Sequence, residues 1–379
     1  MTSDAPTGPV PQFVTVGGNP ARAFGMDAAE RARALAIKAG LDAVEVADAG
    51  RSTIYADLAW AWDPAWLAAL ADAPGRVLVK DGHAVLAHVA AGGDAQPLLA
   101  AMHADRMFAG DGLDRIDADS TDFNYDQLRK RDRPFVMRLD PADPDPVERA
   151  AYDASYKGVT DALTLYLWRR PAFYLTRWAA RAGLSPNFIT SIGALLCVAA
   201  FYFFWVGDYW LGVASGFTFM VLDTVDGKLA RCTGASSKWG NVFDHGIDLV
   251  HPPFWWWAWA HGLAAYGTPL EPIETSMVLW AIIGGYVLQR VIEGVFMRRF
   301  GMMHIHVWER FDSRFRLVTA RRNPNMVILV AALLVARPDW GLILVAFWTV
   351  ISLIVHAIRY AQASEQAARG VPIRSWLAG

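Results

Sequence analysis

Apolar residues are unevenly distributed along this chain. Up to about residue 140 they occur in short runs broken by polar residues and turn signals, whereas after about residue 185 they form long segments with few charges. Such segments are typical of helices that cross a hydrocarbon core of about 30 Å. Six can be drawn, at about 188–206, 209–226, 243–265, 276–298, 324–337 and 340–360. The fifth is short for a full crossing, so we expect tilt or local thinning of the bilayer around it.

The N-terminal part alternates between expected strands and helices. Residues 13–16 form a short apolar run, and a helix is expected to begin after Asp27 and to end before Gly40. Asp81 and Gly82 separate two further apolar runs, which is a strong signal for a β-hairpin. Strands that alternate with helices favour a layered, Rossmann-like unit.

A stretch rich in proline and aspartate, residues 140–146, breaks regular structure and is interpreted as a linker. From about 147 to 183 the pattern predicts an amphipathic helix that lies at the membrane surface with its arginines facing anionic lipid. These arginines are Arg169, Arg170, Arg177 and Arg181. Packing of this helix against the soluble unit is the alternative.

The expected fold is therefore a polytopic α-helical membrane protein, with six transmembrane helices, an amphipathic juxtamembrane helix and an N-terminal soluble α/β domain. The expected boundaries are 1–143 for the soluble domain, 144–183 for the linker and interfacial helix, 184–365 for the membrane domain and 366–379 for a C-terminal tail.

Charges in the loops predict how the helices are oriented. The segment from Arg298 to Arg322 contains seven arginines, whereas the turns at 207–208 and 267–275 contain neither lysine nor arginine. The positive-inside rule places the basic segment and both termini on the cytoplasmic side. The acidic residues described below then face the cytoplasm as well.

Composition narrows the class of protein. The mean hydropathy of +0.22 is high for a soluble protein, and the 17 tryptophans suit a membrane–water interface. A net charge of −2 gives no support to a nucleic-acid-binding role. Cys197 and Cys232 are expected to be free thiols. Residues 1–12 lack the apolar core of a cleaved signal peptide.

Four carboxylates lie at helical spacings where two apolar segments meet. Asp223 and Asp226 share one helix face with two small residues, Gly227 and Ala230. A second face repeats every four residues and carries Gly240, Asp244 and Asp248. Carboxylates at membrane depth are costly unless they hold a cation or line a wet cavity. Oxygen ligands of this kind suit Mg²⁺ or Mn²⁺, and four of them are enough for two ions.

This stretch resembles the signature of the CDP-alcohol phosphotransferase family. The signature reads D-x-x-D-G-x-x-A-R, then eight residues, then G-x-x-x-D-x-x-x-D, and every fixed position is matched between Asp223 and Asp248. The resemblance implies that a substituted phosphate is transferred from a CDP-alcohol donor to an acceptor hydroxyl, with release of CMP. It also implies an enzyme embedded in the lipid bilayer as a homodimer.

The resemblance assigns roles to individual residues. Asp223, Asp226 and Asp244 match metal ligands, and Asp248 matches the aspartate that takes the proton of the acceptor while also touching a metal. The expected nucleotide-binding residues are Gly227, Ala230, Arg231 and Gly240, together with Asn187 and Thr190 of a P-N-x-x-T segment. That segment is equally well interpreted as a plain helix start capped by Ser185.

Other polar residues have both a functional and a structural interpretation. Arg321 and Arg322 precede the fifth span and are expected to bind a phosphate of either substrate, or else to set the topology. Arg290 and Glu293 are interpreted as an internal salt pair rather than as substrate contacts. His245 and His251 flank Asp248; His251 can orient its carboxylate, although polar filling or capping is the simpler interpretation.

The N-terminal domain faintly resembles a nucleotidyltransferase, as in fused inositol-phosphate cytidylyltransferase/di-myo-inositol-phosphate-phosphate synthases. Its loop from Gly17 to Arg22 lacks the following lysine of active enzymes, and Pro20 removes an N–H donor. We therefore expect a degenerate, inactive domain.

Three kinds of substrate remain open at this point. The domain order favours phosphatidylinositol-type or di-inositol-phosphate-type synthesis. The segment from Asp244 to Asp248 resembles the D-H-G-x-D of choline/ethanolamine-type enzymes, which act on a diacylglycerol- or ceramide-like acceptor. Synthesis of the phosphatidylglycerol-phosphate type is the third. A non-catalytic protein that binds or transports divalent cations is the competing class, although its acids would be spread over several depths.

Overall fold

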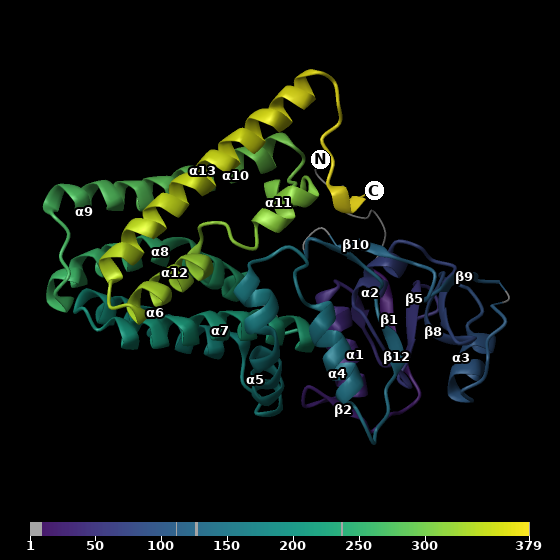
Figure 1. Ribbon diagram of the computed structural model, residues 1–379. Coiled ribbons are helices and arrows are strands. Elements are labelled where there is room, and N and C mark those ends of the chain that lie inside the picture. The colour runs from purple at the N-terminus through teal and green to yellow at the C-terminus, as the bar shows by residue number, and fades with distance from the viewer. Residues whose placement is uncertain (1–9, 111, 126–127, 236–237, 379) are drawn as a thin grey trace.

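The computed structural model describes residues 10–378 apart from 111, 126–127 and 236–237, and the side chains of 238–245 also lie outside the described residues. An α/β unit and a helical part lie side by side (Figure 1). Two helices, α4 (Asp145–Ala154) and α5 (Arg169–Arg181), lie between them.

A six-stranded sheet in the order β4-β1-β5-β8-β7-β9 forms the centre of the α/β unit. Parallel pairing joins β1 to β4, β1 to β5 and β7 to β9, whereas β8 runs antiparallel to β5 and β7. The strands are β1 (Gln12–Val16), β4 (Asp42–Ala43), β5 (Thr53–Asp57), β7 (Arg76–Lys80), β8 (His83–Val89) and β9 (Asp114–Asp117). The predicted α/β unit is thus confirmed, but its sheet is mixed, whereas a Rossmann-like unit has a mostly parallel sheet.

Shorter elements complete this unit. Its helices are α1 (Ala28–Lys38), α2 (Ala65–Ala71) and α3 (Gln96–His103). Two-stranded pairs join β2 (Arg22–Ala23) to β3 (Met26–Asp27), β6 (Trp60–Trp62) to β12 (Val136–Arg138), and β10 (Phe123–Tyr125) to β11 (Lys130–Asp132).

Local sequence signals explain two of these elements. The side chain of Asp27 accepts a hydrogen bond from the backbone N–H of Glu30, which caps α1 as predicted. Between β7 and β8, Asp81 and Gly82 have φ values of 50° and 81°. This left-handed pair suits the tight turn of a hairpin, so the predicted β7–β8 hairpin is confirmed.

The helical part runs from α6 to the C-terminus. Its main helices are α6 (Pro186–Trp205), α7 (Tyr209–Thr233), α8 (Lys238–Tyr266), α9 (Pro272–Leu279), α10 (Gly285–Arg299), α11 (Arg310–Phe315), α12 (Arg322–Leu334) and α13 (Pro338–Ala368). Its short turns of other helix types are η2 (Trp280–Gly284), η3 (Ile305–Val307) and η4 (Trp376–Ala378), and a further one, η1 (Leu163–Leu167), lies between α4 and α5.

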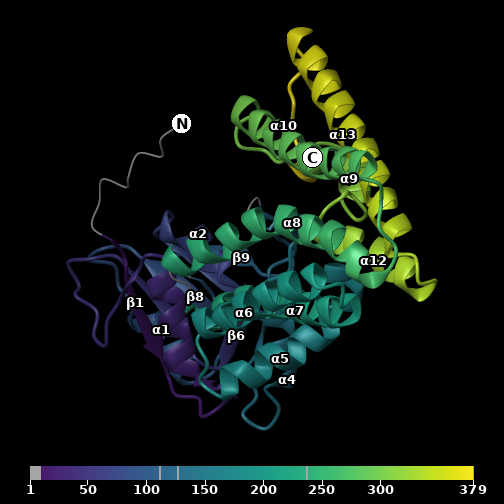
Figure 2. The same cartoon turned by 90° about the vertical axis from the view of Figure 1, so that its left-hand side faces the viewer.

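Within the part of the chain that the structure describes, three helical segments are long and apolar enough to cross a membrane. They are Pro186–Trp205, Pro272–Arg299 and Pro338–Ala368. The helix Arg322–Leu334 is apolar but shorter. Helices α6, α7 and α8 lie together, while α10 and α13 contact each other and project beyond them (Figure 2).

The core of the α/β unit continues into the helical part. Trp62 and Trp66 belong to the same buried cluster as Phe173 of α5 and as Val225 and Leu229 of α7. The C-terminal end of α7, which carries the first half of the acidic motif, is therefore packed directly against the soluble unit. Both cysteines are buried and free, as expected.

Helix α5 is amphipathic, but its arginines are not all turned to solvent or lipid. Arg177 pairs with Asp145 and with the fully buried Glu148 of α4, which also accepts a hydrogen bond from the backbone N–H of Phe24. The expectation that Arg177 faces anionic lipid is thus wrong, because its charge is neutralised inside the protein. Two aromatic side chains of α5, Tyr174 and Trp178, are exposed.

Candidate active site

Helices α7 and α8 and the start of α12 bring two of the predicted acidic residues to one guanidinium group. Asp223 lies on α7 and Asp248 lies on α8. Arg322, the first residue of α12, donates from Nη2 to Asp223 Oδ2 at 2.8 Å and from Nη1 to Asp248 Oδ1 at 2.6 Å. The two faces predicted from the sequence therefore do converge.

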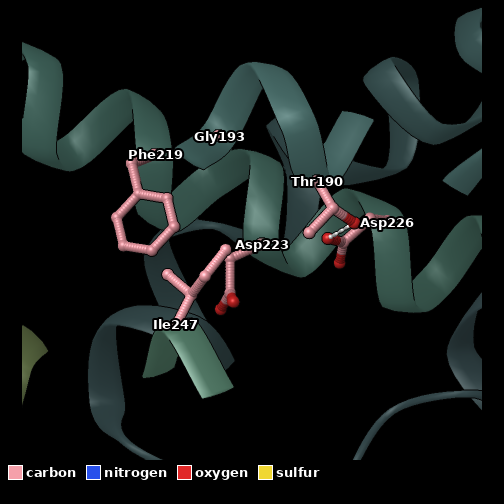
Figure 3. Close-up of a pocket in the computed structure, with 6 residues that line it drawn as sticks. All are labelled: Thr190, Gly193, Phe219, Asp223, Asp226 and Ile247. Carbon is pink, nitrogen blue, oxygen red and sulfur yellow. Dashed lines mark hydrogen bonds between the residues drawn. The ribbon is translucent and has the colours of Figure 1, made fainter. Parts of the chain in front are cut away.

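Asp226 lies one turn after Asp223 and is 4% exposed. The hydroxyl of Thr190, on α6, donates to its Oδ2 at 2.6 Å. Asp223 and Asp226 line one pocket. Figure 3 shows the carboxylate of Asp223 beside the apolar side chain of Ile247, and the carboxylate of Asp226 turned toward Thr190. Among the described residues Asp226 makes no ion pair. A buried carboxylate without a cationic partner is destabilised, so a bound cation would stabilise it.

Around this pocket, glycines let neighbouring side chains pack directly against the helix backbone. A Cβ atom on Gly227 would lie 3.0 Å from Nη2 of Arg231, so the guanidinium of Arg231 occupies the space above this glycine. A Cβ atom on Gly193, which also lines the pocket, would lie 3.3 Å from the ring of Phe219. The predicted nucleotide-binding residues Gly227 and Arg231 thus lie against each other one helical turn apart.

Of the remaining predicted residues, the structure describes the surroundings of Asn187 and Ala230. Asn187 is exposed near the start of α6, where the side chain of Ser185 caps the helix by accepting from the N–H of Phe188. The backbone oxygen of Ala230 accepts a hydrogen bond from Lys38 of the soluble unit. The side chains of Gly240, Asp244 and His245 lie outside the described residues.

Arg322 is held on several sides. Its guanidinium lies 5.0 Å from the centre of the Phe219 ring, and its Nε donates to the side-chain oxygen of Asn323 at 3.3 Å. Asn323 in turn donates to Asp161. The sequence predicted a phosphate-binding role for Arg322 but carried no sign that it would join the acidic residues.

Arg321 points away from the acidic residues toward a second buried cluster. Its Nη2 lies 2.7 Å from Oε2 of Glu293, whose Oε1 also accepts from Arg290 at 2.6 Å. The predicted salt pair between Arg290 and Glu293 is therefore present, with Arg321 as a third member. The two neighbouring arginines of the sequence thus serve different clusters.

Two histidines complete the second cluster, and sequence reasoning missed them. Nε2 of His306 lies 3.3 Å and Nε2 of His356 lies 3.7 Å from Glu293 Oε1. These three residues have the ligand types of a metal site, with ligand atoms within 4.8 Å of one another. Two guanidinium groups already bind the glutamate, however, and they would repel a further cation.

The soluble unit adds positive charge here. Burial, followed by repulsion from Arg321, lowers the pKa of Arg129 to about 10. The members of this cluster come from distant parts of the chain, so only the folded structure reveals it.

His251 takes the simpler of its two predicted roles. Its Nδ1 lies 2.7 Å from the backbone oxygen of Ile247, and its ring packs against Phe219 and Trp255. Among the described residues it makes no hydrogen bond to Asp248. We conclude that His251 fills space in the helix interface.

The donor set around Asp223 fits a hard divalent cation. Asp223, Asp226 and Asp248 offer carboxylate oxygens from two facing helices, which are the ligands that Mg²⁺ and Mn²⁺ prefer. The buried Asp226 has a hydroxyl partner but no cationic one among the described residues. These three residues can hold a divalent cation, provided that it shares or replaces the contacts made by Arg322.

Comparison with known proteins agrees with this geometry. Residues 184–351 match the model of the family described as CDP-alcohol phosphatidyltransferase. The matched segment begins just before α6 and ends inside α13, so it includes all the residues of both clusters except His356 and the soluble unit's Arg129.

Curated relatives include phosphatidylinositol or archaetidylinositol phosphate synthases and cholinephosphotransferases. A phosphatidylinositol phosphate synthase of Mycolicibacterium smegmatis is 33% identical over 26% of this chain and 49% of that protein. A cholinephosphotransferase 1 of Gallus gallus is 32% identical over 32% of this chain and 38% of that protein. An archaetidylinositol phosphate synthase of Pyrococcus horikoshii is 35% identical over 22% of this chain and 44% of that protein.

The matched stretches span less than half the length of these three relatives. They cover between 22% and 32% of this chain, and the family match does not reach the α/β unit. Over residues 184–351, the chain is therefore similar to the CDP-alcohol phosphatidyltransferase family.

Proposed function

We propose that this protein is a membrane enzyme that transfers a substituted phosphate from a CDP-alcohol to an acceptor hydroxyl and releases CMP, as a step of phospholipid or inositol-phosphate-type synthesis. The observation that carries the proposal is the meeting of Asp223 and Asp248 from facing helices, at the spacing of the family signature. The match of residues 184–351 supports the reaction class.

In the proposed reaction, an oxygen of the acceptor attacks the phosphorus that carries the alcohol of the donor. The bond from this phosphorus to the oxygen of CMP breaks, and CMP leaves. Asp248 takes the proton of the acceptor hydroxyl; its exposed carboxylate is within reach of an arriving substrate. Asp223, Asp226, Asp244 and Asp248 would hold Mg²⁺ or Mn²⁺, with two ions in total, and these ions supply charge neutralisation at the diphosphate.

Other residues are proposed to bind the substrates. Arg231 and Gly227 would lie against the nucleotide, together with Ala230, Gly240, Asn187 and Thr190. Arg321 and Arg322 are proposed to bind a phosphate of the donor or acceptor, because paired arginines at the start of a helix favour anions. In the structure Arg321 is paired with Glu293 and Arg322 with Asp223, so a phosphate would have to replace or share these contacts.

We further propose six membrane spans, with the acidic residues and both termini in the cytoplasm, and a homodimer in the bilayer. The α/β unit would be an inactive relative of nucleotidyltransferases. In its Gly17–Arg22 loop, Asn19 donates hydrogen bonds to the backbone oxygens of Leu58 and Leu139, which makes it a structural tie within the unit.

One experiment tests the proposal and also identifies the donor and the acceptor. Purified full-length protein is incubated with Mg²⁺ and a panel of pairs: CDP-diacylglycerol with inositol phosphate or glycerol phosphate, and CDP-choline or CDP-ethanolamine with diacylglycerol or ceramide. We expect CMP to appear with one pair and to depend on Mg²⁺ or Mn²⁺. Release of CMP that survives a chelator would contradict the proposal, and cation flux into vesicles without CMP would favour a transporter.

A further inference from the structure

Arg322 binds two of the carboxylates that the proposed function gives to a divalent cation. Its guanidinium lies 2.8 Å from Asp223 Oδ2 and 2.6 Å from Asp248 Oδ1, and its side chain is 14% exposed. The contact joins three separate helices, α7, α8 and α12. A planar guanidinium with two donor nitrogens is well suited to bridge two carboxylates in this way.

A divalent cation at this position needs the same oxygen atoms. Each carboxylate oxygen that donates a lone pair to a cation is lost, at least in part, as an acceptor for Arg322. A cation and a guanidinium held by one pair of carboxylates also repel each other, more strongly than in water because the side chains of Arg322 and Asp223 are only 14% and 17% exposed. Cation binding and the Arg322 bridge are therefore in competition.

We propose that Arg322 is an internal counter-ion, which stabilises the acidic pair of α7 and α8 and is displaced when a divalent cation binds. This proposal rests on the proposed function for the identity of the cation site. Displacement turns the guanidinium away from Asp223 and Asp248 while the backbone stays at the start of α12, close to the same site. The freed guanidinium is then available to bind a phosphate of the substrate. The cation therefore binds before Arg322 binds that phosphate.

The first test measures cation binding without turnover. Mn²⁺ binding to purified full-length protein is followed by electron paramagnetic resonance for the natural protein, for Arg322→Gln and for Arg337→Gln. The control breaks an ion pair with Asp339 at the start of α13, away from the acidic residues. We expect Arg322→Gln to bind Mn²⁺ about tenfold more tightly or better, because the competing charge is gone, and the control to bind it as the natural protein does.

The second test uses the natural protein and does not depend on a variant that folds. Modification of Arg322 by phenylglyoxal is measured by mass spectrometry with and without Mn²⁺ and with no substrate present. We expect modification of Arg322 to rise severalfold with Mn²⁺, while modification of Arg337 stays constant.

The outcomes separate this inference from the function on which it rests. If the natural protein and Arg322→Gln bind Mn²⁺ equally, or the variant binds it less tightly, the counter-ion role is overturned although the cation site stands. Modification of Arg322 that is unchanged or reduced by Mn²⁺ overturns it as well. If neither the natural protein nor Arg322→Gln binds Mn²⁺, the cation site itself is wrong and both proposals fail.

Discussion

Arg322 and Asp223 lie 99 positions apart in the sequence, yet Nη2 of the arginine lies 2.8 Å from Oδ2 of the aspartate. The same guanidinium reaches Asp248, so one side chain at the start of α12 ties together the two helices that carry the acidic motif. Its neighbour Arg321 turns to Glu293 instead. The basic pair therefore links the acidic site to the buried cluster around Glu293.

Asp226→Asn removes a carboxylate that is only 4% exposed, the most deeply buried of those acidic-site residues whose side chains the structure describes. We expect CMP release to fall by about 10²–10³-fold, because a neutral amide is a poor ligand for Mg²⁺ and no longer offsets charge during transfer. The matched control is Asp208→Asn, since Asp208 caps the far end of the same helix and asparagine caps equally well. Activity of the Asp226 variant close to that of the control would remove this residue from the site.

Thr190→Val deletes the hydroxyl that hydrogen-bonds Asp226 and keeps the shape of the side chain. We expect the Mg²⁺ concentration for half-maximal CMP release to rise about tenfold, because a hydrogen bond to a charged group contributes about 1.5–3 kcal/mol and orients the carboxylate. Thr190→Ser retains the hydroxyl and is expected to retain the Mg²⁺ dependence of the natural protein. Equal behaviour of the two variants would show that the hydroxyl is dispensable.

Glu293→Gln leaves Arg290 and Arg321 without their shared counter-ion. Because the glutamate side chain is only 13% exposed, we expect a loss of about 3–5 kcal/mol in the free energy of unfolding, seen as a lower Tm in detergent. Glu365→Gln breaks an exposed pair with Arg369 and is expected to change Tm very little. Similar Tm values for both variants would mean that the cluster does not stabilise the fold.

His88 makes stability depend on pH. Burial lowers the pKa of His88 below its ordinary value of about 6.5, so the unfolded chain binds a proton at a higher pH than the folded chain does. Its stabilising effect is therefore complete above about pH 6.5 and is lost as the pH falls below that value. We expect Tm to drop less between pH 7.5 and pH 5 in His88→Asn, which keeps a donor for the backbone oxygen of Leu70. Equal drops would show that His88 is not the group responsible.

Removal of the soluble unit tests how far the two parts depend on each other. We expect a chain that starts near Asp145 to retain CMP release in detergent but to have a lower Tm, because Val225 and Leu229 lose the core against which they pack. The isolated segment 1–143 is expected to form no pyrophosphate from CTP and a sugar or inositol phosphate. Pyrophosphate formation would instead indicate an active nucleotidyltransferase.

Several features could be predicted from the sequence because they depend on local geometry. Asp223 and Asp226 share a face of α7 since three residues are nearly one helical turn, and Asp81 with Gly82 forms a hairpin turn since both adopt positive φ. The family signature likewise has fixed spacing within two adjacent helices. These relationships do not depend on how distant segments pack.

Other features could not be predicted, because they arise where distant segments meet. Amphipathic periodicity shows that α5 has a polar face, but it does not distinguish the lipid headgroups from Glu148 of α4, which pairs with Arg177. The partners of Glu293 come from α10, η3, the start of α12 and α13, and no spacing connects them. Packing across elements decides such contacts.

By itself the sequence determined the acidic motif, the family that this motif resembles, the α/β unit and the apolar helices. Helical period, turn chemistry and hydrophobic run length are properties of short segments. Only the tertiary structure decided that Arg322 joins Asp223 to Asp248, that Arg321 joins Glu293, and that the soluble core continues into α7. The physical reason is that a charge excluded from water must be neutralised by whichever opposite charge the fold brings within a few ångströms, however far away it lies in the chain.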